Sequence, residues 1–363
     1  MKYCNLACFF RSTLAFVLLS NATQCFAQQD GPKFVLEGFP TAIHESKVAY
    51  HTKISSAGAN VTNVPFFLLI PSIRRWTPGQ TINVAFSGGD AALYDKISQA
   101  ATIWLKQGGA NLRFSFKDAA GNYRIWRATD TTYAGHIRVA FETGEQNGGY
   151  WSHLGTDSVN RELKGGGPGA ASMNLDSFDR FLPTDWETTV VHEFGHALGF
   201  EHEHQSPAEN CDFRFQDDPG YVAETNADGW YVPNSNGKRP GMYTFLGGFA
   251  NRWSVEKVNR NLRSIPSSSA YLTGAFDKFS VMKYYFDPFM FVNGAESACY
   301  TEQGKNVTLS AQDIVGIQRI YPKAPTAVAA LLAQQRLTIQ QLKSFPGLDK
   351  SVREYLSKRQ LGQ

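Results

Sequence analysis

Apolar positions recur with two different periods along the central part of the chain, and these periods predict both strands and helices. Three segments alternate apolar and polar residues, as half-buried β-strands do: 81–86, 112–116 and 136–141. After Asp90, apolar residues return every three or four positions as far as Trp104. This spacing predicts a helix that begins at Asp90 and stops before Gly108.

Two further helices have recognisable ends. In PTDWETTVVHEFGHALG, Thr184 and Glu187 have the spacing of a capping box, and Gly199 stands where a helix stops. In LSAQDIVGIQRIYP, Ser310 and Asp313 have the same capping spacing. Between the strands and these helices, residues 170–176 are predicted to form one more strand.

The remaining segments are less regular. The glycine-rich stretch 148–169 could suggest phosphate binding, but no Lys-Ser/Thr pair and no helix start follow its glycines, which favours a loop. Residues 28–71 are predicted to be a propeptide or an N-terminal arm. Residues 323–363 shift to Ala, Gln, Leu and Lys and are predicted to form a separate helical tail. The main body of the protein is therefore expected to span residues 72–322.

The first 27 residues have the pattern of a signal peptide. Lys2 and Arg11 precede a short apolar run, and Ala27 marks a plausible cleavage point. Export predicts a secreted protein, or a periplasmic one in a bacterium. Cleavage would leave only Cys211 and Cys299, which are expected to pair in an oxidising compartment, although two separate buried thiols are the alternative.

Composition excludes some functions. The chain has 363 residues and a net charge of +3, which gives no reason to expect nucleic acid or an anionic membrane as partner. No run after the signal peptide approaches the roughly 20 apolar residues that span a bilayer. The segment 337–360 loosely resembles a helix-hairpin-helix element whose basic residues could contact phosphates, but a packing helix pair or a solvated tail is favoured.

Residues 192–202 supply a candidate metal site. His192 and His196 are four residues apart and share one helix face, where two neutral imidazoles can bind one zinc ion. Glu193 lies beside them, in position to act as a base on zinc-activated water. Gly199 permits a sharp turn, so His202 can return as the third ligand. The pattern H-E-x-x-H-x-x-G-x-x-H is matched without a difference, and solvated histidines on a helix are the weaker interpretation.

This motif resembles that of the metzincin metallopeptidases. Metzincins also have a methionine turn beneath the metal, and FSVMKYYF supplies one at Met282. The form S-x-M-x-Y resembles astacins and serralysins, in which the tyrosine reaches the zinc and supports the tetrahedral intermediate. By this resemblance the role falls to Tyr284, with an ordinary core tyrosine as the alternative.

Astacins match better than serralysins. His202 is followed by Glu203 and His204, YWSHLG resembles the astacin segment CWSYVG, and no calcium-binding glycine-rich repeats follow. Two features depart from the family: Tyr150 replaces a cysteine, and the arginine-rich continuation after HEHQSP is missing. No cysteine lies between Ala27 and residue 72, which excludes a cysteine-switch propeptide. An astacin-type aspartate switch in residues 28–71 is the alternative mechanism of inhibition, but no motif for it is matched.

The resemblance implies an α+β fold of the metzincin or zincin type. A twisted mixed sheet and two long helices would lie over an active-site cleft, with an irregular lower subdomain below. It implies a secreted zinc endopeptidase with one zinc ion per chain, acting as a monomer on protein or peptide substrates. The substrate is expected to pair with an edge strand around residues 170–176. A non-catalytic zinc-binding relative is the alternative. The presence of Glu193 disfavours it, because such a relative does not need a catalytic base.

Overall fold

The computed structural model describes residues 38–58, 73–144, 147–249, 251–265, 274–304 and 306–360. The predicted signal peptide, the first part of the predicted N-terminal arm and the segment 59–72 lie outside these ranges. No helix within them combines the length and apolarity needed to cross a membrane. The part of the arm that is described, residues 38–58, is called the arm below.

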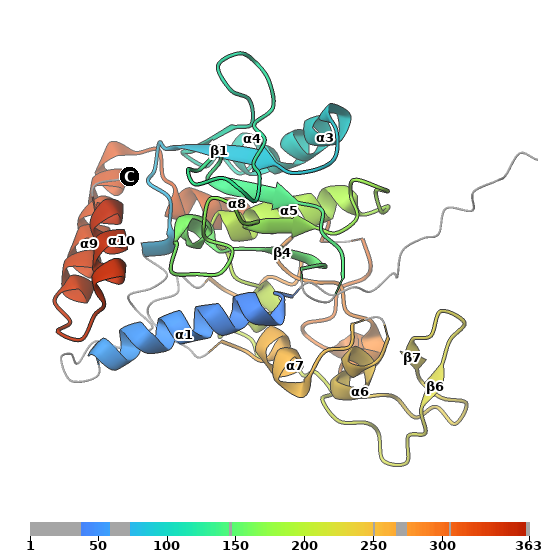
Figure 1. Ribbon diagram of the computed structural model, residues 1–363. Helices are drawn as coiled ribbons and strands as arrows, with labels where there is room; N and C mark the ends of the chain where they lie inside the picture. The colour runs from blue at the N-terminus through green and yellow to red at the C-terminus, as the bar shows by residue number, and fades with distance from the viewer. Residues whose placement is uncertain are drawn as a thin grey trace, which may run out of the picture. The chain divides into compact units, whose positions relative to one another are not determined.

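A five-stranded mixed sheet forms the upper half of the main body, in the order β2-β1-β3-β5-β4. Its strands are β1 (Thr81–Phe86), β2 (Arg113–Ser115), β3 (Ile137–Ala140), β4 (Tyr150–Ser152) and β5 (Met173–Leu175). The first three and β5 run parallel, and β4 pairs antiparallel with β5. The mixed sheet that the sequence predicts is therefore confirmed (Figure 1).

The prediction that residues 170–176 form an edge strand is wrong. β5, within the segment 170–176, pairs with β3 on one side and with β4 on the other, so its backbone has no open edge. The edge strand on this side of the sheet is β4, which lies in the glycine-rich stretch predicted as a loop, and β2 forms the opposite edge. β4 has three residues and its neighbours are glycine-rich, so it shows no alternation long enough to predict a strand.

β3 is also more buried than its alternating sequence predicts. All four of its residues are buried, including Arg138. The guanidinium donates to the carbonyl oxygens of Ala170 at 2.7 Å and Gly165 at 2.9 Å, and to those of Gly135, His136 and Ser158. A cation can be buried here because backbone carbonyl groups accept its hydrogen bonds. Arg138 thereby fixes the loop that follows β4.

Two helical layers pack beside the sheet. The first is α3 (Ala91–Ala101), capped by the Asp90 carboxylate as predicted, and it continues after a break at Thr102 into α4 (Ile103–Lys106). The second is α5 (Trp186–Ala197), which packs against α3. One apolar core joins both helices to the sheet and to α8 (Ala311–Ile320). Ser310 and Asp313 form the predicted capping box of α8.

The capping box predicted for α5 is absent. The helix begins at Trp186, its N-cap is Asp185, and no side chain caps it. Thr184 therefore lies outside the helix, and Glu187 stands in its first turn instead of at the third position. The predicted end of α5 is correct, because Gly199 has a φ of +104°, which glycine adopts without strain.

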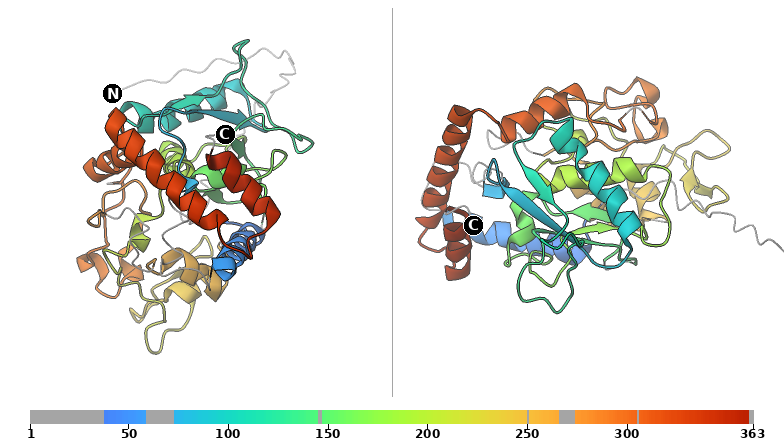
Figure 2. Two further views of the ribbon diagram at one scale, coloured as in Figure 1. Left: turned by 90° about the vertical axis from the view of Figure 1, so that its left-hand side faces the viewer. Right: turned by 90° about the horizontal axis from the view of Figure 1, so that it is seen from above.

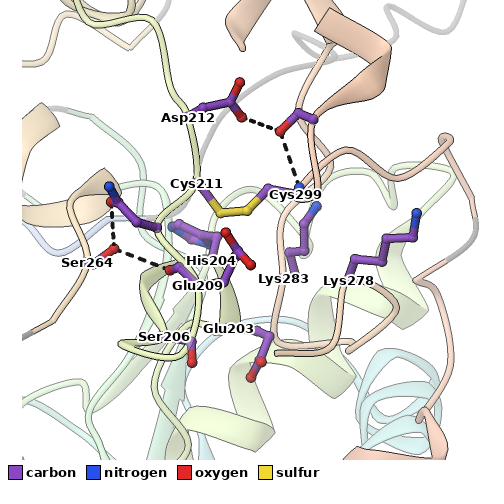
Figure 3. The surroundings of a disulfide bond; sticks show 12 residues. Glu203, His204, Ser206, Glu209, Cys211, Asp212, Ser264, Lys278, Lys283 and Cys299 are labelled. Carbon is purple, nitrogen blue, oxygen red and sulfur yellow. Dashed lines mark hydrogen bonds between the residues drawn. A yellow bond between two sulfur atoms is a disulfide. The ribbon is translucent and has the colours of Figure 1, made fainter. Parts of the chain in front are cut away.

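The lower half has little regular structure. It contains α6 (Met242–Gly247), α7 (Val255–Leu262) and a small ribbon of β6 (Glu224–Thr225) and β7 (Tyr231–Val232). Three short 3₁₀ turns lie at Glu203–Gln205, Pro288–Met290 and Gly294–Glu296. A second, aromatic-rich core holds this half together. The predicted Cys211–Cys299 disulfide lies in that core and joins two segments 88 residues apart (Figure 3).

The two ends of the described chain meet on one side of the main body. α1 (Thr41–Gly58) carries the arm, and α9 (Pro325–Lys343) and α10 (Lys350–Gln360) form a helical hairpin, called the C-terminal hairpin below. Figure 2 shows the hairpin, in red, beside the blue α1. A third apolar core, separate from the other two, contains residues of both.

Candidate active site

Three histidines converge at the end of α5. His192 and His196 lie one turn apart on the helix, and the turn at Gly199 brings His202 back toward them. One nitrogen of each ring can be chosen so that all three lie within 4.8 Å of one another. Within the part of the chain that the structure describes, this is the one group of three such residues that could hold a metal ion.

The orientation of each ring is set by its Nδ1 atom. His192 Nδ1 lies 2.7 Å from the carbonyl oxygen of Val281, and His196 Nδ1 lies 2.6 Å from that of Phe200. A carbonyl only accepts, so both Nδ1 atoms carry the proton and each Nε2 keeps its lone pair. His202 Nδ1 lies 3.2 Å from the side-chain oxygen of Gln205. All three Nε2 atoms are thereby prepared as metal ligands.

The spacing of these nitrogens suits zinc. Two nitrogens bound to one tetrahedral zinc at about 2.05 Å are about 3.3 Å apart, and His196 Nε2 lies 3.0 Å from His202 Nε2. Neutral imidazoles are among the ligands zinc prefers, and three protein ligands leave one position for water. The residues present therefore fit a catalytic zinc site.

Glu193 and Tyr284 flank the histidines. Glu193 follows His192 on α5, and its side chain is 1% exposed. The Tyr284 hydroxyl lies 2.6 Å from His202 Nε2, and its ring stacks on His192 with centroids 5.3 Å apart. The predicted site residues are thus gathered at one place, although they come from two segments about 90 residues apart in the chain.

Comparison with known proteins agrees with this geometry. No family model matches the chain, and no curated protein matches it. Among solved structures, myroilysin is 29% identical over 71% of this chain and 98% of its own, with a TM-score of 0.51. A second myroilysin structure has 28% identity, 69% and 86% coverage, and a TM-score of 0.40. The hatching enzyme HCE-1, a zinc-protease from the medaka Oryzias latipes, is 18% identical over 69% of this chain and 95% of its own, with a TM-score of 0.36.

The first of these similarities spans nearly the whole of the myroilysin chain, and myroilysin belongs to the astacin family. This similarity supports an astacin-like metzincin. The metzincin fold is therefore established together with the three-histidine cluster, and the sequence-based recognition is confirmed.

The methionine turn of this metzincin supports the histidines from below. Met282 is 1% exposed, and its carbonyl oxygen accepts from Glu203 N at 3.0 Å, which ties the turn to the residue after His202. Asp313 holds the turn from the other side. Its carboxylate accepts from the Ser280 hydroxyl at 2.6 Å and from Val281 N at 3.0 Å. The residue predicted only as a helix cap therefore also fixes the carbonyl that orients His192.

A substitution on α5 tests this packing. A Cβ atom at Gly195 would lie 2.3 Å from Met282 Sδ and 2.8 Å from the Trp104 ring. We expect Gly195→Ala to lower the free energy of unfolding by about 1–3 kcal/mol, measured by urea denaturation, because overpacked cores must shift. Gly167→Ala is the control, since nothing lies within 4 Å of its Cβ position. Equal stability of the two variants would contradict the close packing of the methionine turn.

His204 is a further member of the site. Its ring is fully buried and lies 5.0 Å from that of His202 and 4.8 Å from that of Tyr284. His204 Nε2 lies 2.7 Å from the Asn261 carbonyl oxygen, and burial holds its pKa well below the usual value. The ring is therefore neutral and serves as a wall behind His202 and Tyr284. Beside it, Figure 3 shows the disulfide that joins this segment to Cys299.

The arm reaches the open edge of the sheet. Gly38 N donates to the Tyr150 carbonyl oxygen on β4 at 3.3 Å, and the Phe39 ring lies 6.1 Å from that of Trp151. On its other side, Gly38 lies against Trp253 and Lys257 of the lower half. The arm therefore bridges the upper and lower halves where an extended peptide would pair with β4.

The arm also lines a cavity beside the three histidines. This cavity, of about 250 Å³, is lined by the arm residues Gly38, Phe39, His44, Lys47, Val48 and His51 and by His196 and His202, among others. Burial and then Arg74 lower the pKa of His51 to about 2, so its neutral Nε2 accepts from Arg74 Nη2 at 2.7 Å. Arg74 also contacts Glu201, at 3.4 Å, between Gly199 and His202.

No sequence pattern indicates these arm residues or several supporting groups of the site. His44 and His51 are about 150 residues from the zinc motif, so nothing in their spacing connects them with it. Gln205 and His204 adjoin the motif, and their position next to His202 was the available signal. His153 is fully buried and lies 3.0 Å from the Lys164 carbonyl oxygen, which makes it a structural residue of the loop after β4.

Proposed function

We propose that the chain is a secreted zinc-dependent endopeptidase with one zinc ion per chain, held by His192, His196 and His202. One observation supports this above the others: three oriented imidazoles and a buried glutamate lie together beside the open edge of β4. A site built only to hold zinc needs neither the glutamate nor the sheet edge. The astacin-like fold supports the same conclusion.

Each group has a part in hydrolysis. A bound zinc ion supplies Lewis-acid activation of water and of the scissile carbonyl. Glu193 accepts the proton of the attacking water and delivers it to the leaving amine. The Tyr284 hydroxyl donates to the developing oxyanion. The backbone of an extended substrate pairs with β4, which replaces residues 170–176 in the role that sequence analysis gave them.

Blocked peptides test the endopeptidase assignment. A substrate with an acetylated N-terminus and an amidated C-terminus offers no free end, so only internal cleavage gives products. We expect two fragments whose masses sum to that of the peptide plus one water, and no cleavage after treatment with a zinc chelator. Removal of single terminal residues from unblocked peptides alone would contradict the proposal.

Loss of the tyrosine hydroxyl should reduce turnover. We expect Tyr284→Phe to lower kcat by about 10²-fold with little change in KM, because a donor to the oxyanion acts mainly in the transition state. Tyr221→Phe is the matched control, since its hydroxyl donates to the Val232 carbonyl oxygen in the lower half. An unchanged kcat in Tyr284→Phe would remove the tyrosine from the mechanism.

We also propose that residues 1–27 are a signal peptide and that residues 28–71 are an inhibitory propeptide. The contacts of Gly38 and Phe39 with β4 support this, because they occupy the edge that a substrate needs. On export, N-terminal sequencing should find Gln28 as the first residue, and the intact chain should cleave peptides slowly until the arm is removed by limited proteolysis. Full activity of the intact chain would contradict inhibition by the arm.

A further inference from the structure

The C-terminal hairpin is a rigid unit that is fastened to the catalytic region. Arg353 closes it by donating to the carbonyl oxygens of Lys343, Phe345 and Leu348. Arg359 donates to the Arg75 carbonyl oxygen at 2.6 Å, at the point where the chain enters the catalytic region. The Tyr355 hydroxyl lies 3.3 Å from both oxygens of Thr156, in the 3₁₀ turn Gly155–Val159 that follows β4 in the chain. The hairpin is therefore held independently of α1.

The apolar face of the hairpin is buried with α1. The buried residues of this core are Tyr50 and Ile54 from α1, Ile73, Leu163, and Ile339, Leu342, Phe345, Leu348, Val352 and Leu356 from the hairpin and its turn. Ile54 and Leu342 have no exposed surface. At the rim, Lys53 forms a salt bridge with Asp349. The second half of α1 therefore packs into a core to which the hairpin contributes most of the side chains.

The other half of α1 lies over the cavity. Ile43 and Lys47 are buried there, and the Ser46 hydroxyl oxygen accepts from Lys164 N at 2.8 Å, whereas Val48, which lines the cavity, is about half exposed. An isolated helix of 18 residues is marginal in water without apolar packing. Because the apolar core that α1 shares with the hairpin lies at Tyr50 and Ile54, the hairpin helps to hold the helix over the histidines.

We propose that the apolar face of the C-terminal hairpin is the docking surface for the arm, and that this contact keeps the arm over the active-site cleft. The hairpin acts as a latch: it holds one end of α1, and the other end covers the zinc ligands and β4. The consequence for activity rests on the proposed peptidase function, whereas the docking itself does not.

Hydrogen exchange of the full chain, followed by mass spectrometry, tests the docking. In Leu342→Ala, which leaves a cavity in the shared core, we expect exchange of α1 to rise by about tenfold or more, including at its cleft end, while α5 is unchanged. Leu337→Ala is the matched control, because Leu337 lies on the same helix and is 67% exposed. Unchanged exchange in α1, or an equal rise in α1 and α5, would overturn the proposal.

Reversing the charges of a surface ion pair tests the same docking if Leu342→Ala does not fold. Both partners of the Lys53–Asp349 pair are partly exposed, so their substitution leaves the core intact. We expect Lys53→Glu to raise exchange of α1 by about two- to fivefold, and the double variant with Asp349→Lys to restore it, as a surface ion pair allows. Failure of the double variant to restore slow exchange would overturn the docking.

Peptide cleavage by the same samples separates this inference from the proposed function. If the hairpin holds an inhibitory arm, intact Leu342→Ala cleaves a peptide faster than the intact wild type, and the two are equal once the arm has been digested. If digested wild type is active but intact Leu342→Ala stays as slow as the intact wild type, the latch is refuted. If α1 loosens and no sample cleaves peptide, the proposed function fails and the docking stands.

Discussion

Glu193→Gln is expected to lower kcat/KM for a peptide by about 10²- to 10⁴-fold, the range that general acid–base catalysis contributes. The amide has the shape of the carboxylate but accepts no proton at neutral pH, so water attack loses its base. Zinc content should be unchanged, because Glu193 is not among the three ligands. The ratio to wild type is best measured after limited proteolysis has removed the arm from both proteins.

Glu187→Gln serves as the control for this substitution, since Glu187 lies on the same helix and is exposed in its first turn. It should keep wild-type activity and zinc. A Glu193→Gln variant that binds zinc and retains more than about a tenth of wild-type activity would exclude Glu193 as the base.

The second large effect is expected from His196→Ala. Its Nε2 lies 3.0 Å from that of His202, so its loss removes a central member of the ligand set. We expect zinc no longer to remain bound through gel filtration, and peptide cleavage to fall to background.

Loss of the Gln205 side chain, which contacts His202 Nδ1, should have a smaller effect than loss of His196. We expect zinc affinity to fall by about 10- to 100-fold, as for other groups that orient a metal ligand.

A histidine outside the cluster controls for His196→Ala. His136 is partly buried, its Nδ1 accepts from Asn83 N at 2.8 Å, and it takes no part in the three-histidine group. His136→Ala should keep zinc and activity. Retention of one zinc per chain by His196→Ala would mean that the ligand set is different from the one described.

The zinc helix could be predicted from sequence because its geometry is local. His192 and His196 share a face by helical spacing alone, and Gly199 fixes the turn that returns His202. Tyr284 and Met282, in contrast, came only from a family resemblance, since 80 residues separate them from the motif. Their positions depend on Asp313, whose carboxylate holds the turn through Ser280 and Val281.

The errors have a common physical cause in long-range pairing. β5 enters the sheet between β3 and β4, and no local pattern tells which of two consecutive strands ends at the edge. The alternating sequence predicts an outward-facing Arg138, but three carbonyl groups 20 to 32 residues away and two adjacent ones accept its hydrogen bonds. The packing of the arm and the C-terminal hairpin likewise joins residues about 290 positions apart, such as Ile54 and Leu342.

Whether the three histidines form a catalytic zinc site can be decided by measuring bound zinc and peptide cleavage on one sample of purified, arm-digested protein. The zinc is counted per chain by mass spectrometry of the metal, before and after a chelator and after zinc is returned. We expect one zinc per chain, cleavage that disappears with the metal, and cleavage that returns with it. Cleavage that persists without zinc, or a fully zinc-loaded protein that cleaves nothing, would show that the histidines are not a catalytic zinc site.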